Sequence, residues 1–119
     1  MSSYRDLIVW KAAMEIAVAC YDVTKLFPNT EVFGMTAQIR RSAASIPANI
    51  AEGHGRESTG AFIQFLRVAQ GSLKELETHL ILAGRVGLLN DAKVSQLLGQ
   101  TEEIGKMLRS LVRSLQQKT

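Results

Sequence analysis

The sequence predicts an all-α fold, in which four helices form an antiparallel up-down-up-down bundle as a single domain over residues 1–119. Three observations support this fold class. Apolar residues recur at steps of three and four along four segments, which is the period of helices that each bury one face. Alternation at period two, which would indicate strands, extends over no more than a few residues. The connections between the segments are short, and short connections favour antiparallel neighbours.

The first helix is expected from about Tyr4 to Phe27. Ser3 followed by Asp6 resembles a capping box, and Pro28 ends the helix because the residue before a proline avoids helical backbone. Two apolar stripes at helical spacing predict a wide buried face. The stripes are Leu7, Trp10, Met14, Ala17 and Tyr21, and Val9, Ala13, Ile16, Cys20, Val23 and Phe27.

The second helix is expected between about Thr30 and Glu52, and its three faces differ. Pro47 removes a backbone donor and clashes with the carbonyl of Ala43, so we predict a kink at Pro47. The core stripe is Met35, Ile39, Ala43, Ile46 and Ile50. A row of small residues that would let another backbone come close is Ala37, Ala44, Ala48 and Ala51. A polar stripe is Gln38, Arg41 (or Ser42), Ser45, Asn49 and Glu52.

The polar stripe on this helix has two interpretations. Short polar residues such as Ser45 and Asn49 are unusual on a helix that faces solvent, where Lys and Glu dominate. They suit a face that meets another polar protein surface, so the stripe is predicted to be a subunit interface of a homo-oligomer. The alternative is a kinked helix whose polar face simply meets water.

The third and fourth helices begin at N-cap residues. Ser58 or Thr59 is expected to cap the third, Gly84 and Gly87 mark its end, and Asn90 is expected to cap the fourth. The buried stripe of the third helix is Phe62, Leu66, Ala69, Leu73, Leu76, Leu80 and Ala83. That of the fourth is Val94, Leu97, Thr101, Ile104, Leu108, Leu111 and Leu115.

Composition and charge limit the cellular setting. The chain carries 14 basic and 11 acidic residues, and the positive excess lies toward the C-terminus. The single cysteine, Cys20, cannot form an internal disulfide, which favours a buried thiol in a reducing compartment. The N-terminal residues lack a signal-peptide pattern, and no apolar run approaches the roughly 18 residues of a membrane span. We therefore expect a cytoplasmic protein with no membrane partner.

No catalytic site, metal site or cofactor is expected. A di-iron bundle needs a Glu three residues before a His on two helices, and neither His54 nor His79 has one. Glu75 and His79 share a helix face, but two ligands do not make a metal site, and an ion pair is the preferred interpretation. Cys20 has no histidine at helical spacing, so it is a poor nucleophile. The protein is predicted not to be an enzyme.

A basic stripe on the last helix is the candidate nucleic-acid-binding site. Lys106, Arg109 and Arg113 step by three and four, so they share one outward face. The alternative is a solvated charged face. An oligomer would repeat these three charges in every copy. This repetition would favour binding of nucleic acid, because the affinity rises with the number of phosphates that the protein neutralises.

Three stretches of the sequence form one long motif: LFPNTEVFG (26–34), QIRRSAASIPANIAEGHGR (38–56) and FLRVAQGSLKELE (65–77). With Trp10 in LIVWKAA, they resemble the signature of the bacterial four-helix-bundle family of 23S rRNA intervening-sequence proteins. The resemblance covers almost the whole chain. Ser42 stands where the family often has Ala, and Met35 stands where Leu is usual, and neither change threatens the fold.

The resemblance implies a small homo-oligomer, commonly a pentameric ring. It also implies kinship with the accessory proteins of diversity-generating retroelements, which are similar pentameric bundles that bind nucleic acid and a reverse transcriptase. The expected partners are therefore further copies of the chain, RNA or DNA, and a reverse transcriptase or other protein. The alternative function is a protein-interaction scaffold with no direct role in nucleic-acid binding.

Overall fold

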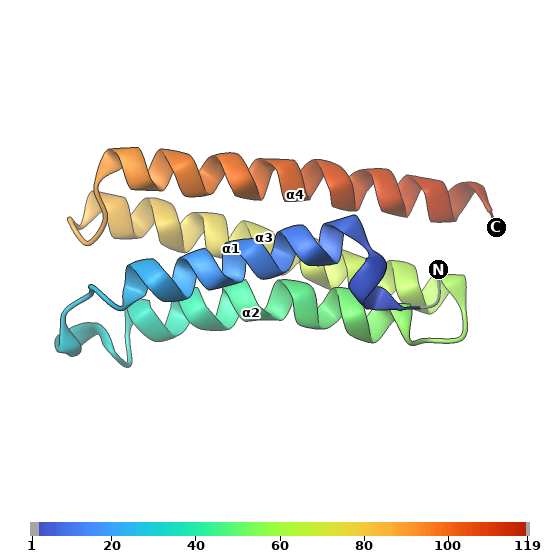
Figure 1. The fold of residues 1–119 in the computed structure, drawn as a ribbon, viewed down its shortest axis with the longest axis horizontal. Helices are drawn as coiled ribbons and strands as arrows, with labels where there is room; N and C mark the ends of the chain where they lie inside the picture. The colour runs from blue at the N-terminus through green and yellow to red at the C-terminus, as the bar shows by residue number, and fades with distance from the viewer. Residues whose placement is uncertain (1–2, 119) are drawn as a thin grey trace.

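The computed structural model describes residues 3–118, and in this range the chain forms four α-helices and two short 3-10 helices without a strand. Consecutive α-helices run in opposite directions along a bundle of 47 × 22 × 20 Å (Figure 1). The four predicted helices are therefore confirmed. The α-helices are α1 (Ile8–Thr24), α2 (Met35–His54), α3 (Thr59–Arg85) and α4 (Asp91–Gln117), and the 3-10 helices are η1 (Tyr4–Asp6) and η2 (Asn29–Glu31).

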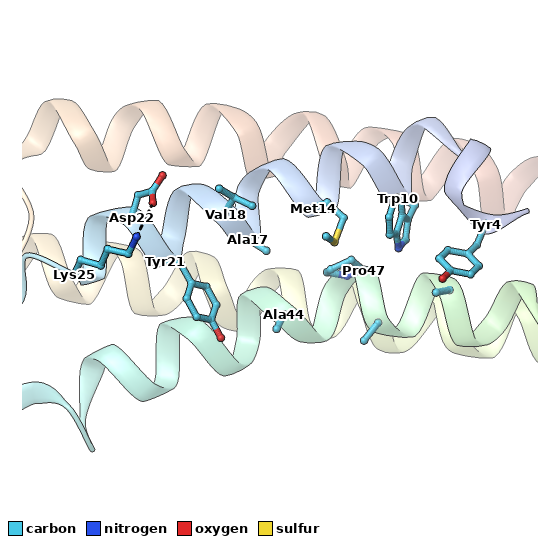
Figure 2. Close-up of a pocket in the computed structure, with 12 residues that line it drawn as sticks. Tyr4, Trp10, Met14, Ala17, Val18, Tyr21, Asp22, Lys25, Ala44 and Pro47 are labelled. Carbon is cyan, nitrogen blue, oxygen red and sulfur yellow. Dashed lines mark ion pairs between the residues drawn. The ribbon is translucent and has the colours of Figure 1, made fainter.

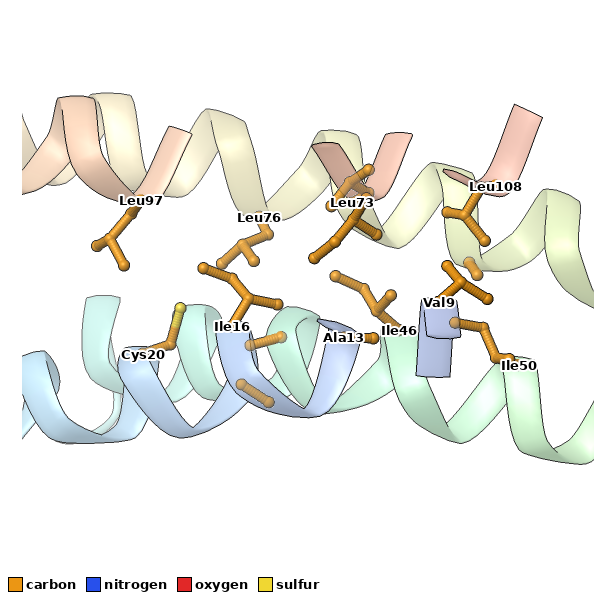
Figure 3. Packing of buried hydrophobic residues seen from close by; sticks show 14 of the residues in the cluster. Val9, Ala13, Ile16, Cys20, Ile46, Ile50, Leu73, Leu76, Leu97 and Leu108 are labelled. Atoms are coloured by element: carbon orange, nitrogen blue, oxygen red, sulfur yellow. The ribbon is translucent and has the colours of Figure 1, made fainter. Parts of the chain in front are cut away.

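One apolar core runs along the bundle axis, and every α-helix contributes to it (Figure 3). The predicted stripes supply nearly all of its side chains, because a 3.6-residue period puts these positions on one face of each helix. Val112 of α4 is also buried, although the predicted stripe omitted it. The largest fully buried side chains are Ile16, Ile39, Ile46, Ile50, Leu66, Leu73, Leu76, Leu80, Leu97, Thr101, Ile104 and Leu108.

The first helix is shorter at both ends than the sequence predicted. Ser3 caps η1 rather than α1, since its Oγ accepts a hydrogen bond from the Arg5 amide at 3.1 Å. Leu7 is extended and buried, so it separates η1 from α1. At the other end α1 stops at Thr24, and turns carry the chain to the buried side chain of Phe27. Local capping and the burial of two flanking apolar residues therefore determine where α1 begins and ends.

The second helix begins five residues later than expected, at Met35. Residues Asn29–Glu31 form η2 instead, and Gly34 precedes α2 with φ −105° and ψ −115°. The Glu31 carboxylate accepts a hydrogen bond from the Met35 amide at 3.1 Å, which caps the new helix start. At the other end α2 continues two residues past Glu52, to His54. The helix continues through the buried Pro47, and the bend there stays a prediction.

The ends of α3 and α4 agree with the sequence analysis. Ser58 Oγ accepts from the Ala61 amide at 3.1 Å, and Asn90 Oδ1 accepts from the Lys93 amide at 2.7 Å, so both caps are confirmed. Gly87 follows α3 with φ +84°, a conformation that favours glycine. Short polar caps and one glycine are therefore enough to set the α3–α4 connection.

Candidate functional site

The polar stripe of α2 makes contacts with α3 of the same chain. Arg41 Nη2 donates to Gln38 Oε1 at 2.6 Å and to Glu75 Oε2 of α3 at 2.9 Å. The Arg41 guanidinium holds the pKa of the Glu75 carboxyl below its ordinary value. The Arg41 side chain is 60% exposed in the single chain, so this ion pair lies at the surface.

The middle of the polar stripe is also satisfied within the chain. The hydroxyls of Ser45 and Ser72 lie 2.8 Å apart and link α2 to α3. Asn49 donates to the backbone oxygen of Ser45 at 2.8 Å. Glu52 pairs with Arg56 one turn later at 2.9 Å and remains half exposed. Every member of the predicted interface stripe therefore has a partner in its own chain, while the outer side chains stay accessible.

His79 lies at the end of the same α2/α3 seam. Its Nε2 atom is 3.7 Å from Glu75 Oε2, so the two groups are neighbours as their spacing predicted. This buried nitrogen has no hydrogen-bond partner among residues 3–118. Glu75 and His79 do not recruit a third ligand, because the described part of the chain has no group of three or more potential metal-ligating side chains.

An apolar groove of about 590 Å³ runs between α1 and α2 (Figure 2). Its α1 side carries Trp10, Met14, Ala17 and Tyr21 of the apolar stripe that begins at Leu7, which was expected to be buried. That expectation is wrong for Met14 and Tyr21, which are 39% and 42% exposed, because α1 turns mainly the stripe that begins at Val9 toward the core, while Leu7 and Ala17 are also buried. The α2 side is the row of small residues. The lining side chains are Tyr4, Trp10, Met14, Ala17, Val18, Tyr21, Asp22, Lys25, Ala44, Pro47, Ala48 and Ala51.

One cation joins the two helices at the end of this groove. Arg40 Nε donates to Thr24 Oγ1 at 2.8 Å, and its guanidinium lies 4.6 Å from the centre of the Tyr21 ring. Arg40 therefore ties α2 to the C-terminal turn of α1, where the helix dipole favours a positive charge. The sequence analysis missed both the groove and Arg40. The useful signal was the width of the apolar surface on the first helix, since two full stripes exceed what one bundle core covers.

The predicted basic stripe lies on the outer face of α4, and all three of its residues are exposed. Lys106 pairs with Glu103 at 3.5 Å. Within the described range, Arg109 and Arg113 form no ion pair with a carboxylate. The Arg109 guanidinium instead lies over Gly105 one turn earlier, where a Cβ atom would come within 3.4 Å of its Nη1. The stripe therefore presents two arginines whose charges are not neutralised by the chain.

Cys20 is the single cysteine of the chain, and its side chain is buried. Burial raises the pKa of the Cys20 thiol to about 12, so the thiol stays protonated near neutral pH. Among residues 3–118, no helix has the length and apolar character needed to cross a membrane. The predicted site residues therefore lie on two surfaces, the α2 face with its flanking groove and the basic side of α4.

Comparison with known proteins agrees with this architecture. Residues 5–110 match the family described as 23S rRNA-intervening sequence protein. A crystal structure of a protein of unknown function from the S23 ribosomal protein family of Bacteroides thetaiotaomicron VPI-5482 is similar, with 31% sequence identity and a TM-score of 0.82. The match covers 88% of this chain and 98% of that one. No curated protein matches the sequence. The chain belongs to the family of 23S rRNA-intervening sequence proteins.

Proposed function

We propose that this protein is a non-enzymatic, cytoplasmic homo-oligomer that binds RNA or DNA through the basic stripe of α4. One observation carries the nucleic-acid part of the proposal: Arg109 and Arg113 are exposed and have no carboxylate partner within residues 3–118. Guanidinium groups match phosphate geometry and lose little hydration on contact. An exposed, unpaired arginine on a rigid helix is therefore ready to bind a phosphate.

Assembly is supported by the outer face of α2. The small side chains of Ala37, Ala44 and Ala48 are exposed there, so another helix can approach closely. The apolar groove borders this row on one side, and the accessible polar side chains border it on the other. The partner we propose for this face is a second copy of the chain, as the family resemblance implies.

The chain also exposes apolar side chains that a second copy could use. Leu26 and Phe33, in the connection between α1 and α2, are 87% and 93% exposed. Exposed apolar groups of this size are costly in water, and removing them from water contributes roughly 25 cal/mol per Å² of buried area. The groove and the protruding apolar connection lie on different parts of the surface. If the connection of one copy docks in the groove of the next, the copies join head to tail, and a head-to-tail contact generates a ring when the rotation from copy to copy closes. A pentamer is the ring size that the resemblance favours.

The nucleic-acid proposal is tested with a triple charge reversal. The variant Lys106→Glu, Arg109→Glu, Arg113→Glu should lose binding to labelled RNA or DNA in fluorescence anisotropy at low salt, while its circular dichroism stays helical. Unchanged binding by this variant would remove the stripe from the proposal. Wild-type protein that binds neither RNA nor DNA would remove the function itself.

A protein-interaction scaffold is the second candidate, and the apolar groove favours it. A groove lined by aromatic side chains and small alanines suits the apolar face of a helix from another polypeptide. A reverse transcriptase is one such partner, given the kinship that the resemblance implies. Salt titration separates the two functions, because nucleic-acid binding falls steeply with salt concentration and apolar docking does not.

A further inference from the structure

The positive charge of the chain is concentrated on one half of the α3/α4 pair. Residues 58–74 and 104–118 together contain six basic residues and no acidic residue. The rest of the chain carries eight basic and eleven acidic residues, so its net charge is negative. Lys118 lies about half a turn around the axis of α4 from Arg109, so the basic ridge comprises the other five basic residues: Arg67, Lys74, Lys106, Arg109 and Arg113.

Contacts between α3 and α4 bring these two segments to the same level of the bundle. Thr101 Oγ1 donates to Glu77 Oε2 at 2.8 Å, and a Cβ atom at Gly105 would lie 3.5 Å from the side chain of Leu73. From the first contact to the second, the residue number rises from 101 to 105 on α4 and falls from 77 to 73 on α3. The two helices are therefore antiparallel in a defined register. This register puts Arg67 of α3 opposite the stretch of α4 between Arg109 and Arg113.

The side chains on α3 lie on the flank that faces α4. Lys74 donates to Glu77 Oε1 at 3.1 Å, and the other oxygen of the same carboxylate binds Thr101 of α4. Arg67 precedes Lys74 by two helical turns, so it shares that flank. Arg67 contacts the Gln70 amide oxygen at 3.4 Å and has no carboxylate partner among the described residues.

The side chains on α4 approach the same seam from the other side. The guanidinium of Arg109 lies over Gly105, and Gly105 contacts Leu73 of α3. Arg113 follows Arg109 by one turn on the same face. Ion pairs to Glu77 and Glu103 neutralise only Lys74 and Lys106, at one end of the ridge. Asp6 of η1 and Lys106 line a groove between residues 6–9 and α4, and neither Arg109 nor Arg113 lines that groove.

Aromatic side chains are absent from the ridge. Helix α4 contains no Phe, Tyr, Trp or His. On the neighbouring part of α3, the ring of Phe62 packs on His54 of α2, and the ring of Phe65 lies under the guanidinium of Arg56. Both rings therefore contact the α2 side, and Phe65 also borders a surface hollow that Arg67 lines. Proteins that hold single strands stack bases on aromatic side chains, whereas duplexes are held through phosphates.

We infer that the basic ridge binds the phosphate backbone of double-helical nucleic acid, with Arg67 of α3 acting together with Arg109 and Arg113, and without readout of base sequence. This inference rests on the proposed function and specifies its ligand. Lys106 and Arg113 are seven residues apart, so the ridge is about 10 Å long at 1.5 Å per residue. That length spans about three base pairs at 3.4 Å each.

The test compares duplex and single-stranded ligands. Full-length protein is titrated by fluorescence anisotropy with a 24-base-pair DNA duplex, an RNA duplex and the separated strands, between 50 and 200 mM salt. We expect the duplexes to bind at least about tenfold more tightly than the strands, with little change when the sequence is scrambled. The DNA and RNA arms tell which duplex is preferred.

The role of Arg67 is tested with a matched pair of variants. Arg67→Gln should weaken duplex binding about threefold or more and reduce the log–log salt slope by about 0.9, the value for one phosphate contact. Arg85→Gln removes the same charge at the opposite end of α3 and should leave both quantities unchanged. Light scattering on each variant checks that assembly is unaltered.

The outcomes distinguish this inference from the proposed function. Tight binding of single strands that the α4 charge reversal abolishes would overturn the duplex inference and leave the proposed function standing. Equal effects of Arg67→Gln and Arg85→Gln would overturn the role of Arg67. Absence of binding to every ligand at 50 mM salt would overturn both.

Discussion

Leu73 and Leu108 show how single side chains hold the bundle together. Leu73 is 2% exposed, and Leu108 has no exposed surface. Replacing either one by Ala should lower the free energy of unfolding by about 2–5 kcal/mol, because the lost apolar contact and the remaining cavity both cost energy. Urea denaturation of each variant measures this change.

Leu82 provides a control on the same helix as Leu73. Its side chain is 45% exposed at the outer face of α3, so Leu82→Ala should change the free energy of unfolding much less than Leu73→Ala. A change below about 0.5 kcal/mol for Leu73→Ala would contradict the packing described above.

Cys20 predicts a specific dependence of stability on alkaline pH. Burial raises the thiol pKa to about 12 in the folded protein, while an unfolded cysteine titrates near 8.5. Because the folded pKa is the higher one, the contribution of Cys20 is complete below the unfolded pKa and is lost as pH rises toward about 12. The free energy of unfolding should therefore fall more steeply between pH 9 and pH 11 in wild type than in Cys20→Ala. Chemical denaturation at several pH values measures both curves, and parallel curves would argue against a buried thiol.

At the scale of elements, α2 and α3 are joined by a polar seam as well as by apolar packing. Arg41 and Glu75 have side chains that are 60% and 40% exposed, so their ion pair should contribute about 1 kcal/mol or less to the folding of one chain. Since the pKa of Glu75 is lowered in the folded state, this contribution is present above the pKa of an unfolded glutamate and is lost as pH falls through the lower folded pKa. Thermal unfolding should show a small difference between wild type and Arg41→Ala at pH 7 that shrinks at pH 3. A difference that persists undiminished in acid would exclude Glu75 as the partner.

At the scale of the whole molecule, the accessible polar side chains of α2 are the ones that we propose to contact a second copy of the chain. If Arg41 and Glu52 become buried between copies, removing either side chain leaves an unpaired charge in the contact, which costs about 3–5 kcal/mol. Arg41→Ala and Glu52→Ala should then weaken assembly far more than Lys118→Ala. Sedimentation velocity or light scattering at micromolar concentration measures the oligomer.

Two results would contradict this assembly prediction. Wild-type protein that stays monomeric at micromolar concentration would exclude the homo-oligomer. Variants at Arg41 and Glu52 that assemble as well as wild type would mean that the polar stripe serves only the α2/α3 contact inside each chain. Substituting a groove alanine, as in Ala48→Glu, then tests the apolar side of the same face, where a charged side chain should prevent close approach.

The sequence by itself was sufficient to predict four helices, the N-caps at Ser58 and Asn90 and almost the entire core. These features depend on local rules, because helical period and capping chemistry act within a few residues along the chain. The helix starts at Ile8 and Met35 were not predictable in the same way. They depend on the burial of Leu7 and on a cap from Glu31, which compete with local helix propensity.

Contacts between helices decided the features that bear most directly on function. Both stripes of α1 have the same period, so only its packing against α2 and α4 determined that Val9 and Ile16 enter the core while Met14 and Tyr21 line a groove. The partner of Arg41 depended likewise on the register of α2 against α3. Arg67 joined the basic side of α4 because the antiparallel register of α3 and α4 brings residues more than 40 positions apart to one level. A periodic pattern specifies which residues of a helix share a face, but the neighbour that each face meets is set by the packing of the whole bundle.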